Sequence, residues 1–156
     1  NGAPETVDYD ALHVVPPHRA PAWISDSGLG DGGSVGRVDV DPETLQHVRH
    51  PHVWSLGDAA GLGVMSSGGA IRSQSPVLVH NLFAAGPAQF QRYDGYTVAP
   101  IALSRRTLLL AEVDRQLRPE PSFGVRDLAN PRPWTFLFDR WLQPALYWKG
   151  ILRGLI

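Results

Sequence analysis

Proline and glycine interrupt this chain so often that long, continuous secondary structure is confined to a few stretches. The 156 residues include 16 glycines and 14 prolines. Proline breaks helices and cannot donate to a sheet, whereas glycine favours turns. The spacing of apolar residues therefore predicts only two helical regions, one from about Gly69 to Ala85 and one that begins near Trp134.

Short apolar runs between these breaks predict strands. They lie at residues 12–15, 35–40, 45–48, 53–56 and 108–113. Asp41-Pro42-Glu43-Thr44 is typical of a turn, so the second and third runs are expected to form a hairpin. Residues 117–133 contain four prolines and are expected to be irregular. Hydrophobic residues make up 43% of the chain and charged residues 19%, as in a folded domain.

The composition excludes several kinds of chemistry. The formal net charge is −1, so the basic excess of a typical nucleic-acid binder is missing, and we expect no nucleic-acid partner. There is no cysteine, so disulfides, thiolate metal sites and cysteine nucleophiles cannot be formed within these 156 residues.

Charge is distributed unevenly along the chain. Residues 1–102 carry 5 basic and 10 acidic side chains, whereas residues 103–156 carry 9 basic and 5 acidic ones. The aromatic residues of the last part gather in the same region, from Trp134 to Trp148. This asymmetry indicates that the C-terminal part faces something anionic.

Three patterns resemble known sites but lack the required context. Gly28–Gly33 matches G-x-G-x-x-G, yet no buried strand precedes it and no helix follows, so we interpret it as a loop. His47, His50 and His52 are close in sequence, but Pro51 breaks helical spacing, so a solvated turn is favoured over a metal site and no metal is expected. No G-x-S-x-G elbow supports a serine nucleophile, although order alone leaves a Ser/His/Asp triad open.

A more informative pattern joins the run 53–56 to Gly57-Asp58 and then to the first predicted helix. A strand that runs into Gly-Asp places a carboxylate at the carboxyl end of a sheet, where open α/β sheets bind ligands. Asp58 could accept hydrogen bonds from sugar or ribityl hydroxyls, and Gly57 allows close approach. The free N–H groups after Ser66-Ser67 could stabilise negative charge on a reduced ring system. A plain crossover with a capping Asp or Ser explains the pattern equally well.

The C-terminal aromatic residues recur at helical spacing. Trp134, Leu137, Phe138, Trp141, Leu142, Ala145 and Leu146 share one side, and Thr135, Asp139 and Gln143 mark the other. Pro144 is expected to kink or divide the helix, and the uncharged stretch is too short to span a bilayer. An interfacial helix lying on a membrane is favoured, with a helix packed on the protein's own core as the alternative.

Several segments together resemble the C-terminal portion of a sulfide:quinone oxidoreductase, a flavoprotein family of the pyridine nucleotide-disulfide reductase superfamily. The segments with this resemblance are Tyr9–Pro17, Val38–Asp41, Thr44–His47, Leu56–Asp58, Gly68–Pro76, Tyr93–Thr97, Leu110–Glu112 and Pro144–Trp148. The resemblance implies an α/β fold with parts of FAD/NAD(P)-binding Rossmann-like domains, followed by a strand and amphipathic helices. It assigns residues 1–50 to the end of a second dinucleotide-binding domain, 51–92 to the FAD domain and 93–156 to a quinone- and membrane-facing region.

The resemblance also implies functional residues and partners. Asp58, beside Gly57, would hold the ribityl chain of FAD, and the backbone of Gly68, Gly69, Ala70 and Ile71 would face the flavin ring. Trp141, Leu146, Tyr147 and Trp148 would contact quinone and attach the protein to a membrane surface as a monotopic, peripheral protein. Electrons would pass from a small donor, sulfide in the family, through FAD to quinone, with an N-terminal portion of the same protein as partner.

Two positions depart from the family pattern. Family members usually carry a cysteine two residues after Tyr-Asp-Gly-Tyr-Thr, where this chain has Ala99, and a common lysine is replaced by Ser66. A methyl group cannot replace a nucleophilic thiolate, so flavin and quinone roles survive this change better than sulfide oxidation does. A non-enzymatic membrane-associated module and a soluble flavoprotein with another donor are the alternatives. The chain alone is expected to be inactive.

Overall fold

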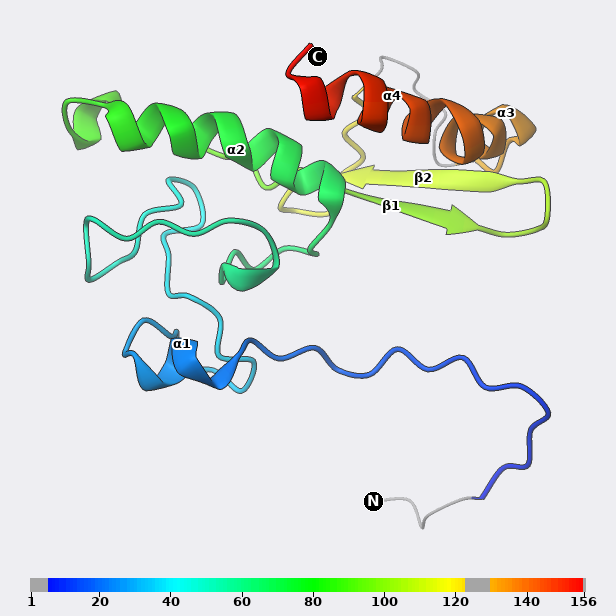
Figure 1. Ribbon diagram of the computed structural model, residues 1–156, viewed down its shortest axis with the longest axis horizontal. Coiled ribbons are helices and arrows are strands. Elements are labelled where there is room, and N and C mark those ends of the chain that lie inside the picture. The colour runs from blue at the N-terminus through cyan, green and yellow to red at the C-terminus, as the bar shows by residue number, and fades with distance from the viewer. Residues whose placement is uncertain (1–5, 123–129, 156) are drawn as a thin grey trace.

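The computed structural model describes residues 6–122 and 130–155. Helix α2, Gly68–Phe83, is the longest element and lies between a loop-rich body and a C-terminal unit. The body contains the short helix α1, Ala22–Asp26, and the 3₁₀ turn η1, Gly57–Ala59. The C-terminal unit is a two-stranded hairpin covered by helices (Figure 1). The coarse expectation of an α/β fold is thus met by the described residues, which combine helices with one small antiparallel sheet.

Helix α2 confirms the first predicted helical region. It begins after Ser67, whose hydroxyl oxygen accepts the Ala70 N–H at 3.1 Å, and it ends before Gly86 and the 3₁₀ turn η2, Pro87–Gln89. Pro76 lies in the helix interior, although the sequence placed it at a bend or in the first turn. Pro76 and Arg72 are both exposed, so the Arg72 carbonyl, which loses its helical donor, can be hydrated.

Strands β1, Thr97–Ala102, and β2, Leu108–Val113, form an antiparallel sheet. Thr97 pairs with Val113 and Ala102 with Leu108, so the register is continuous from one end to the other. The prediction of a strand at 108–113 is confirmed. Strand β1 was not predicted, because Pro100 lies within it. Proline is tolerated here because, among the described residues, β1 is paired on one side only, whereas the outer edge of β2 also bridges to Arg132 and Pro119.

The other predicted strands are not formed as ladders. The expected hairpin is reduced to a single antiparallel bridge between Val40 and His47, and the run 53–56 contributes one bridge from Trp54 to Gln46. The prediction of a buried strand at residues 12–15 is wrong, because this segment is exposed and leads away from the body (Figure 1). Within the described ranges, parallel pairing is limited to one bridge between Val38 and Ala60, so partial Rossmann-like domains are not seen.

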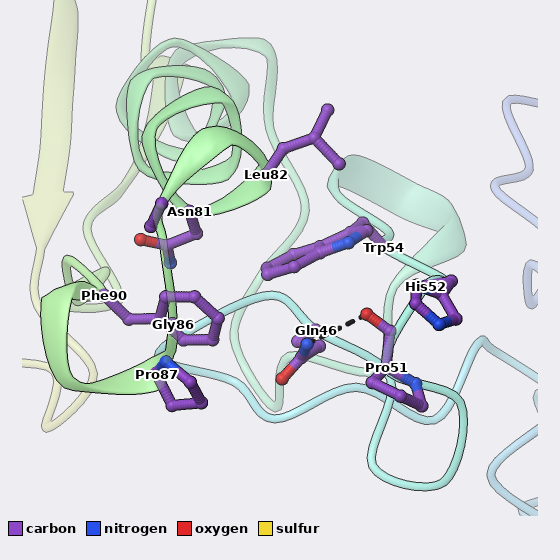
Figure 2. A pocket seen from close by; sticks show the side chains of 10 residues that line it. Gln46, Pro51, His52, Trp54, Asn81, Leu82, Gly86, Pro87 and Phe90 are labelled. Carbon is purple, nitrogen blue, oxygen red and sulfur yellow. Dashed lines mark hydrogen bonds between the residues drawn. The ribbon is translucent and has the colours of Figure 1, made fainter.

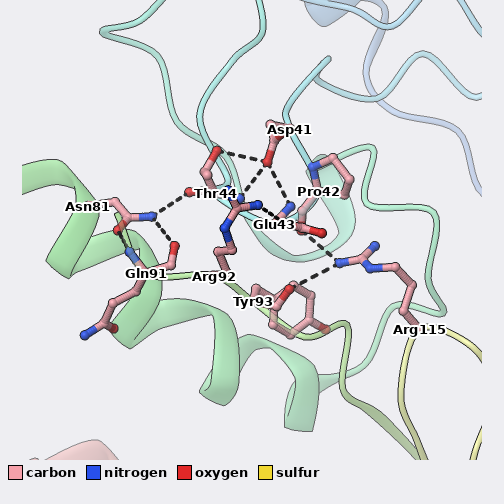
Figure 3. Close-up of polar contacts among 9 residues, drawn as sticks. All are labelled: Asp41, Pro42, Glu43, Thr44, Asn81, Gln91, Arg92, Tyr93 and Arg115. Carbon is pink, nitrogen blue, oxygen red and sulfur yellow. Dashed lines mark hydrogen bonds and ion pairs between the residues drawn. The ribbon is translucent and has the colours of Figure 1, made fainter. Parts of the chain in front are cut away.

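The loop-rich body is held by a compact core and by polar side chains that bind backbone groups. The buried members of the core are Ile24, Val38, Val40, Leu45, Ala60, Leu62, Val77 and Tyr93. Figure 3 shows Arg115 reaching this region from beyond β2, where its guanidinium donates to the Pro42 carbonyl at 3.0 Å. The same group donates to the Leu62 carbonyl at 2.8 Å and lies over the Tyr93 ring. The Arg115 guanidinium therefore connects loops that have little regular structure of their own.

The C-terminal helical region is continuous but not uniform. It consists of α3, Pro133–Leu137, the π-helical turn η3, Phe138–Leu142, helix α4, Gln143–Lys149, and the 3₁₀ turn η4, Ile151–Arg153. The Gln143 N–H donates to the Phe138 carbonyl five residues earlier, as in a π-helix. The expected division at Pro144 thus takes the form of a wide turn just before the proline, which has no N–H to offer a preceding carbonyl.

Candidate functional site

The structure brings the Gly57-Asp58 turn against the start of helix α2. Gly57 is buried and has a φ of +64°, and its N–H donates to the Gln74 side-chain oxygen at 2.8 Å. A Cβ at Gly57 would lie 3.1 Å from the Ile71 Cδ1 atom. The two segments that the sequence marked as a possible ligand site are therefore in direct contact, and glycine is required at the turn.

The outer side of this contact is accessible. Asp58 is exposed, and its carboxylate makes no hydrogen bond or ion pair with the part of the chain that the structure describes. A Cβ at Gly68 would meet no atom within 4 Å. An accessible carboxylate can accept hydrogen bonds from ligand hydroxyl groups. The free backbone N–H groups at the open helix start can donate to the same ligand.

Other predicted residues of this site have internal partners. Besides capping Ala70, the Ser67 hydroxyl oxygen accepts the Val98 N–H at 3.3 Å, and Ala70 itself is buried. A Cβ at Gly69 would lie only 2.2 Å from the Val98 Cγ1 atom. Gly69 and Ala70 thus allow α2 to pack closely on β1, a role that the Gly-Gly pattern alone did not reveal.

Adding one methyl group at Gly69 is expected to strain this packing. We expect Gly69→Ala to lower the free energy of unfolding by about 2 kcal/mol, because Val98 is β-branched and cannot easily move aside. Thermal unfolding of the protein expressed from its complete reading frame measures the effect. Gly68→Ala, which has open space, is the matched control, and Val98→Ala should rescue the first variant. Equal unfolding temperatures for the two glycine variants would contradict the packing role.

Ala99 lies in the middle of β1, opposite Ala111 on β2. It is half-buried, and both cross-strand partners carry only a methyl group. The position at which the resemblance expects a thiol is therefore part of the sheet that packs on helix α2.

The three neighbouring histidines differ in burial: His50 and His52 are exposed, as expected for a solvated turn, whereas His47 has a structural role. His47 is buried rather than solvated as expected, because its Nδ1 atom accepts the Arg49 N–H at 3.0 Å and the His50 N–H at 3.2 Å. Its Nε2 atom lies 3.2 Å from the Leu29 carbonyl, so both ring nitrogens have protein partners. Over residues 6–122 and 130–155 no group of side chains is arranged to hold a metal ion. Gly28–Gly33 forms turns after α1, which confirms its interpretation as a loop.

The apolar side of the C-terminal helices faces outward. Thr135, on the expected polar side, is completely buried and donates to the Leu108 carbonyl of β2. In contrast, Trp141 is 68% exposed and Trp148 is 66% exposed. An open depression of about 620 Å³ lies on this side, lined by Trp134, Leu137, Phe138, Trp141 and Leu142. The alternative in which this apolar side packs on the chain's own core thus holds for Phe138, which packs against Leu108 and Leu110, but not for the exposed Trp134 and Trp141.

Leu146 and Tyr147, the other two residues expected to contact quinone or a membrane, are also exposed on α4. The Tyr147 and Trp148 rings meet edge to face with centroids 5.4 Å apart. A search of the described helices found none with the length and apolar character needed to cross a bilayer. All four predicted contact residues are therefore accessible to a partner.

A second cavity was not anticipated from the sequence. It has a volume of about 330 Å³ and lies at the C-terminal end of α2, where the Trp54 and Phe90 rings meet edge to face (Figure 2). Gln46 and His52 line the opposite side, and Gln46 donates to the Pro51 carbonyl. The sequence pattern predicted a buried strand around Trp54, and such a pattern does not indicate which residues line a cavity.

No sequence pattern indicated that the carboxylate of Glu112 is buried. Glu112 on β2 accepts hydrogen bonds from the Tyr96 hydroxyl at 2.5 Å and from the Ser122 hydroxyl. Burial raises the pKa of Tyr96 to about 12, and the bond to Glu112 acts in the same direction. Tyr96 is therefore protonated at neutral pH and donates to Glu112, whose carboxylate also accepts from Ser122 and so holds residue 122 against the sheet.

The fold and the accessible groups define the chain as an α/β unit with a ligand-accessible turn and an exposed apolar helix surface. No protein-family model matches it. The chain is 38% identical over 152 residues to the mitochondrial sulfide:quinone oxidoreductase of Dictyostelium discoideum, and 35% identical over 155 residues to that of Mus musculus. These alignments cover 96% and 98% of this chain. The similarity to the sulfide:quinone oxidoreductases that the motifs indicated is thereby confirmed.

The chain spans about a third of the length of these relatives, since the alignments cover 33% and 34% of them. Among solved structures, it is similar to a chain in the cryo-EM structure of the Tetrahymena thermophila mitochondrial ATP synthase, an F1Fo composite tetramer. That likeness has a TM-score of 0.62 and 23% identity, and covers 90% of this chain and 32% of the other. At this identity it concerns the fold alone.

Proposed function

We propose that this chain forms the C-terminal part of a membrane-peripheral, FAD-dependent oxidoreductase of the sulfide:quinone oxidoreductase type. In this proposal electrons pass from a small reduced donor through FAD to quinone. The observation that carries it is the similarity to sulfide:quinone oxidoreductases along almost the entire chain. Residues 1–50 would end a second dinucleotide-binding domain, 51–92 would belong to the FAD domain, and 93–156 would face quinone and the membrane.

The residues at the Gly57 turn fit a flavin in two respects. The Asp58 carboxylate is accessible and uncommitted, so it can accept hydrogen bonds from ribityl hydroxyls. Gly57 is buried against Ile71, so its missing side chain serves the contact with α2 that holds Asp58 in place. The open backbone at Gly68, with the start of α2, would face the ring. When bound, FAD would supply the ability to accept electrons from the donor and deliver them to quinone.

Removing the Asp58 carboxylate tests the flavin site. We expect Asp58→Ala to weaken FAD binding by roughly 10- to 30-fold, because a charged acceptor for ligand hydroxyls is lost. Flavin absorbance and fluorescence titration of the protein from its complete reading frame measure this change. Asp26→Ala, at the exposed end of α1, is the matched control for charge. Absence of flavin from the unmodified protein, or equal affinities in both variants, would refute this site.

The outward apolar side of α3–α4 supports the quinone and membrane part of the proposal. A quinone dissolved in a bilayer needs an apolar entrance at the membrane surface, and exposed tryptophan and tyrosine side chains suit that interface. Trp141, Leu146, Tyr147 and Trp148 would provide these contacts. The protein would thus associate peripherally with a membrane.

Ala99 favours a second candidate for the donor half of the reaction. Because this position has no thiolate to attack sulfur, a flavoprotein that reduces quinone with a donor other than sulfide is consistent with the sequence. The two candidates share the flavin and differ in the reductant. Reduction of the bound flavin by sulfide, compared with reduction by a nicotinamide, separates them.

A further inference from the structure

We propose that the tip of the β1–β2 hairpin and the outward side of α3–α4 form one docking surface that selects anionic phospholipids. The surface comprises two parts: a basic tip, residues 103–107, and the apolar side chains of the C-terminal helices. This inference rests on the proposed membrane association and adds the lipid headgroup charge that the surface recognises.

The tip is built to present Arg105 and Arg106 to solvent. The Ser104 hydroxyl oxygen accepts the Arg106 N–H at 3.1 Å and the Thr107 N–H at 3.0 Å, and the Leu103 N–H donates to the Thr107 carbonyl. These bonds close a tight turn with both arginines exposed. Neither guanidinium has a hydrogen bond or ion pair with the residues that the structure describes. The two charges are therefore available to a partner.

The basic tip lies beside the first turn of α3. Leu108, the residue that follows the tip, exchanges backbone hydrogen bonds with Arg132, and its carbonyl also accepts from the Thr135 hydroxyl. Figure 1 shows the loop between the strands at the same end of the molecule as α3. Leu103 is exposed at the tip, as is Trp134 in α3. Apolar and basic side chains thus lie next to each other.

The charge of this region favours an anionic partner. Residues 101–110 and 130–155 contain six basic side chains and one acidic one, Asp139. On the helices, the Arg140 guanidinium lies over the Trp141 ring, 5.5 Å from its centroid. Lys149 and Arg153 are exposed near the end of the chain. A guanidinium stacked on an exposed indole is suited to the boundary between acyl chains and phosphate groups.

An anionic bilayer matches both halves of this surface. Exposed tryptophans and leucines gain free energy by leaving water, and each basic side chain near an anionic membrane adds attraction that a neutral membrane does not provide. A soluble polyanion would use the arginines but leave the apolar side chains in water. Phosphate groups of membrane lipids are therefore the partner that we assign.

The test compares vesicles of phosphatidylcholine alone with vesicles that also contain phosphatidylglycerol. Co-sedimentation of the protein from its complete reading frame should be stronger with the anionic vesicles. The double variant Arg105→Gln/Arg106→Gln should reduce binding to them by about 25-fold and change binding to neutral vesicles little. Arg19→Gln/Arg37→Gln removes the same charge from the acidic part of the chain and serves as the matched control. Trp141→Ala should weaken binding to both vesicle types.

The outcomes separate this inference from the proposed function. Binding to neither vesicle type would overturn this inference together with the membrane part of the proposed function, while the flavin part would still be tested by Asp58→Ala. Equal binding to both types, or equal losses in the two arginine double variants, would overturn the lipid selectivity while leaving membrane attachment intact. High salt should reduce the preference for anionic vesicles, since exposed charges are screened.

Discussion

Replacing Asn81 with alanine is expected to lower the free energy of unfolding by about 3 kcal/mol. Asn81 is buried in α2, and its side-chain amide donates to the Thr44 and Gln91 carbonyls, each at 3.0 Å. Its side-chain oxygen accepts the Gln91 N–H at 2.7 Å (Figure 3). Alanine would remove three hydrogen bonds at once and leave the Thr44 and Gln91 backbone groups without their side-chain partner. Urea unfolding followed by tryptophan fluorescence measures the change.

The matched control for Asn81 is its own partner. The side chain of Gln91 is exposed, and only its backbone binds Asn81, so Gln91→Ala should change stability by less than about 0.5 kcal/mol. Comparable losses in the two variants would show that the amide network does not hold residues 44 and 91 to the helix.

Introducing a thiol at Ala99 is expected to raise sulfide-dependent quinone reduction by at least about 10²-fold. A thiolate at this position, unlike a methyl group, can form a bond to the sulfur of sulfide while the proposed FAD accepts the two electrons that this oxidation releases. The substitution adds one sulfur atom opposite Ala111, so the hairpin should tolerate it. Turnover of Ala99→Cys with sulfide and a water-soluble quinone, in the protein from its complete reading frame, measures the gain.

A cysteine elsewhere on the same strand provides the control. Ala102→Cys places a thiol at the exposed end of β1, where no gain is expected. Flavin reduced chemically should be reoxidised by quinone at similar rates in both variants and in the unmodified protein. Rapid sulfide oxidation by the unmodified protein would contradict the importance of position 99 and leave sulfide as the natural donor.

The sequence predicted best where the signal was local and strong. Helix α2 and strand β2 were both found. Burial alternates along β2, whereas the buried side of α2 includes Gln74 and Asn81, and Ile71 and Leu82 are exposed.

The sequence placed Asp58 at the carboxyl end of a sheet, but residues 53–56 form only one isolated bridge, so Asp58 follows a loop. The contact between Gly57 and Ile71 was not predicted, because the pattern gave only the order of the two segments. The role of Asp58 toward FAD remains a proposal.

The failures arise from long-range contacts that a linear pattern does not contain. Leu12 to Val15 resemble a buried strand, but apolar composition alone cannot provide a pairing partner. His47 was expected in solvent, yet its side chain is buried. Its ring nitrogens bind two local N–H groups and the carbonyl of Leu29. Arg115 binds loops near residues 42 and 62, a separation that no periodicity reveals.

The π-helical turn at Phe138–Leu142 has a consequence for the way this region can vary in length. Each residue of an α-helix turns the chain by about 100°. The wider π-helical turn accommodates one extra residue before α4 begins. Deleting one residue there would let the turn close as an ordinary α-helical turn, so Leu146, Tyr147 and Trp148 would keep nearly the same direction relative to Trp134. This turn can therefore shorten by one residue without putting the aromatic side chains of the two helices out of phase.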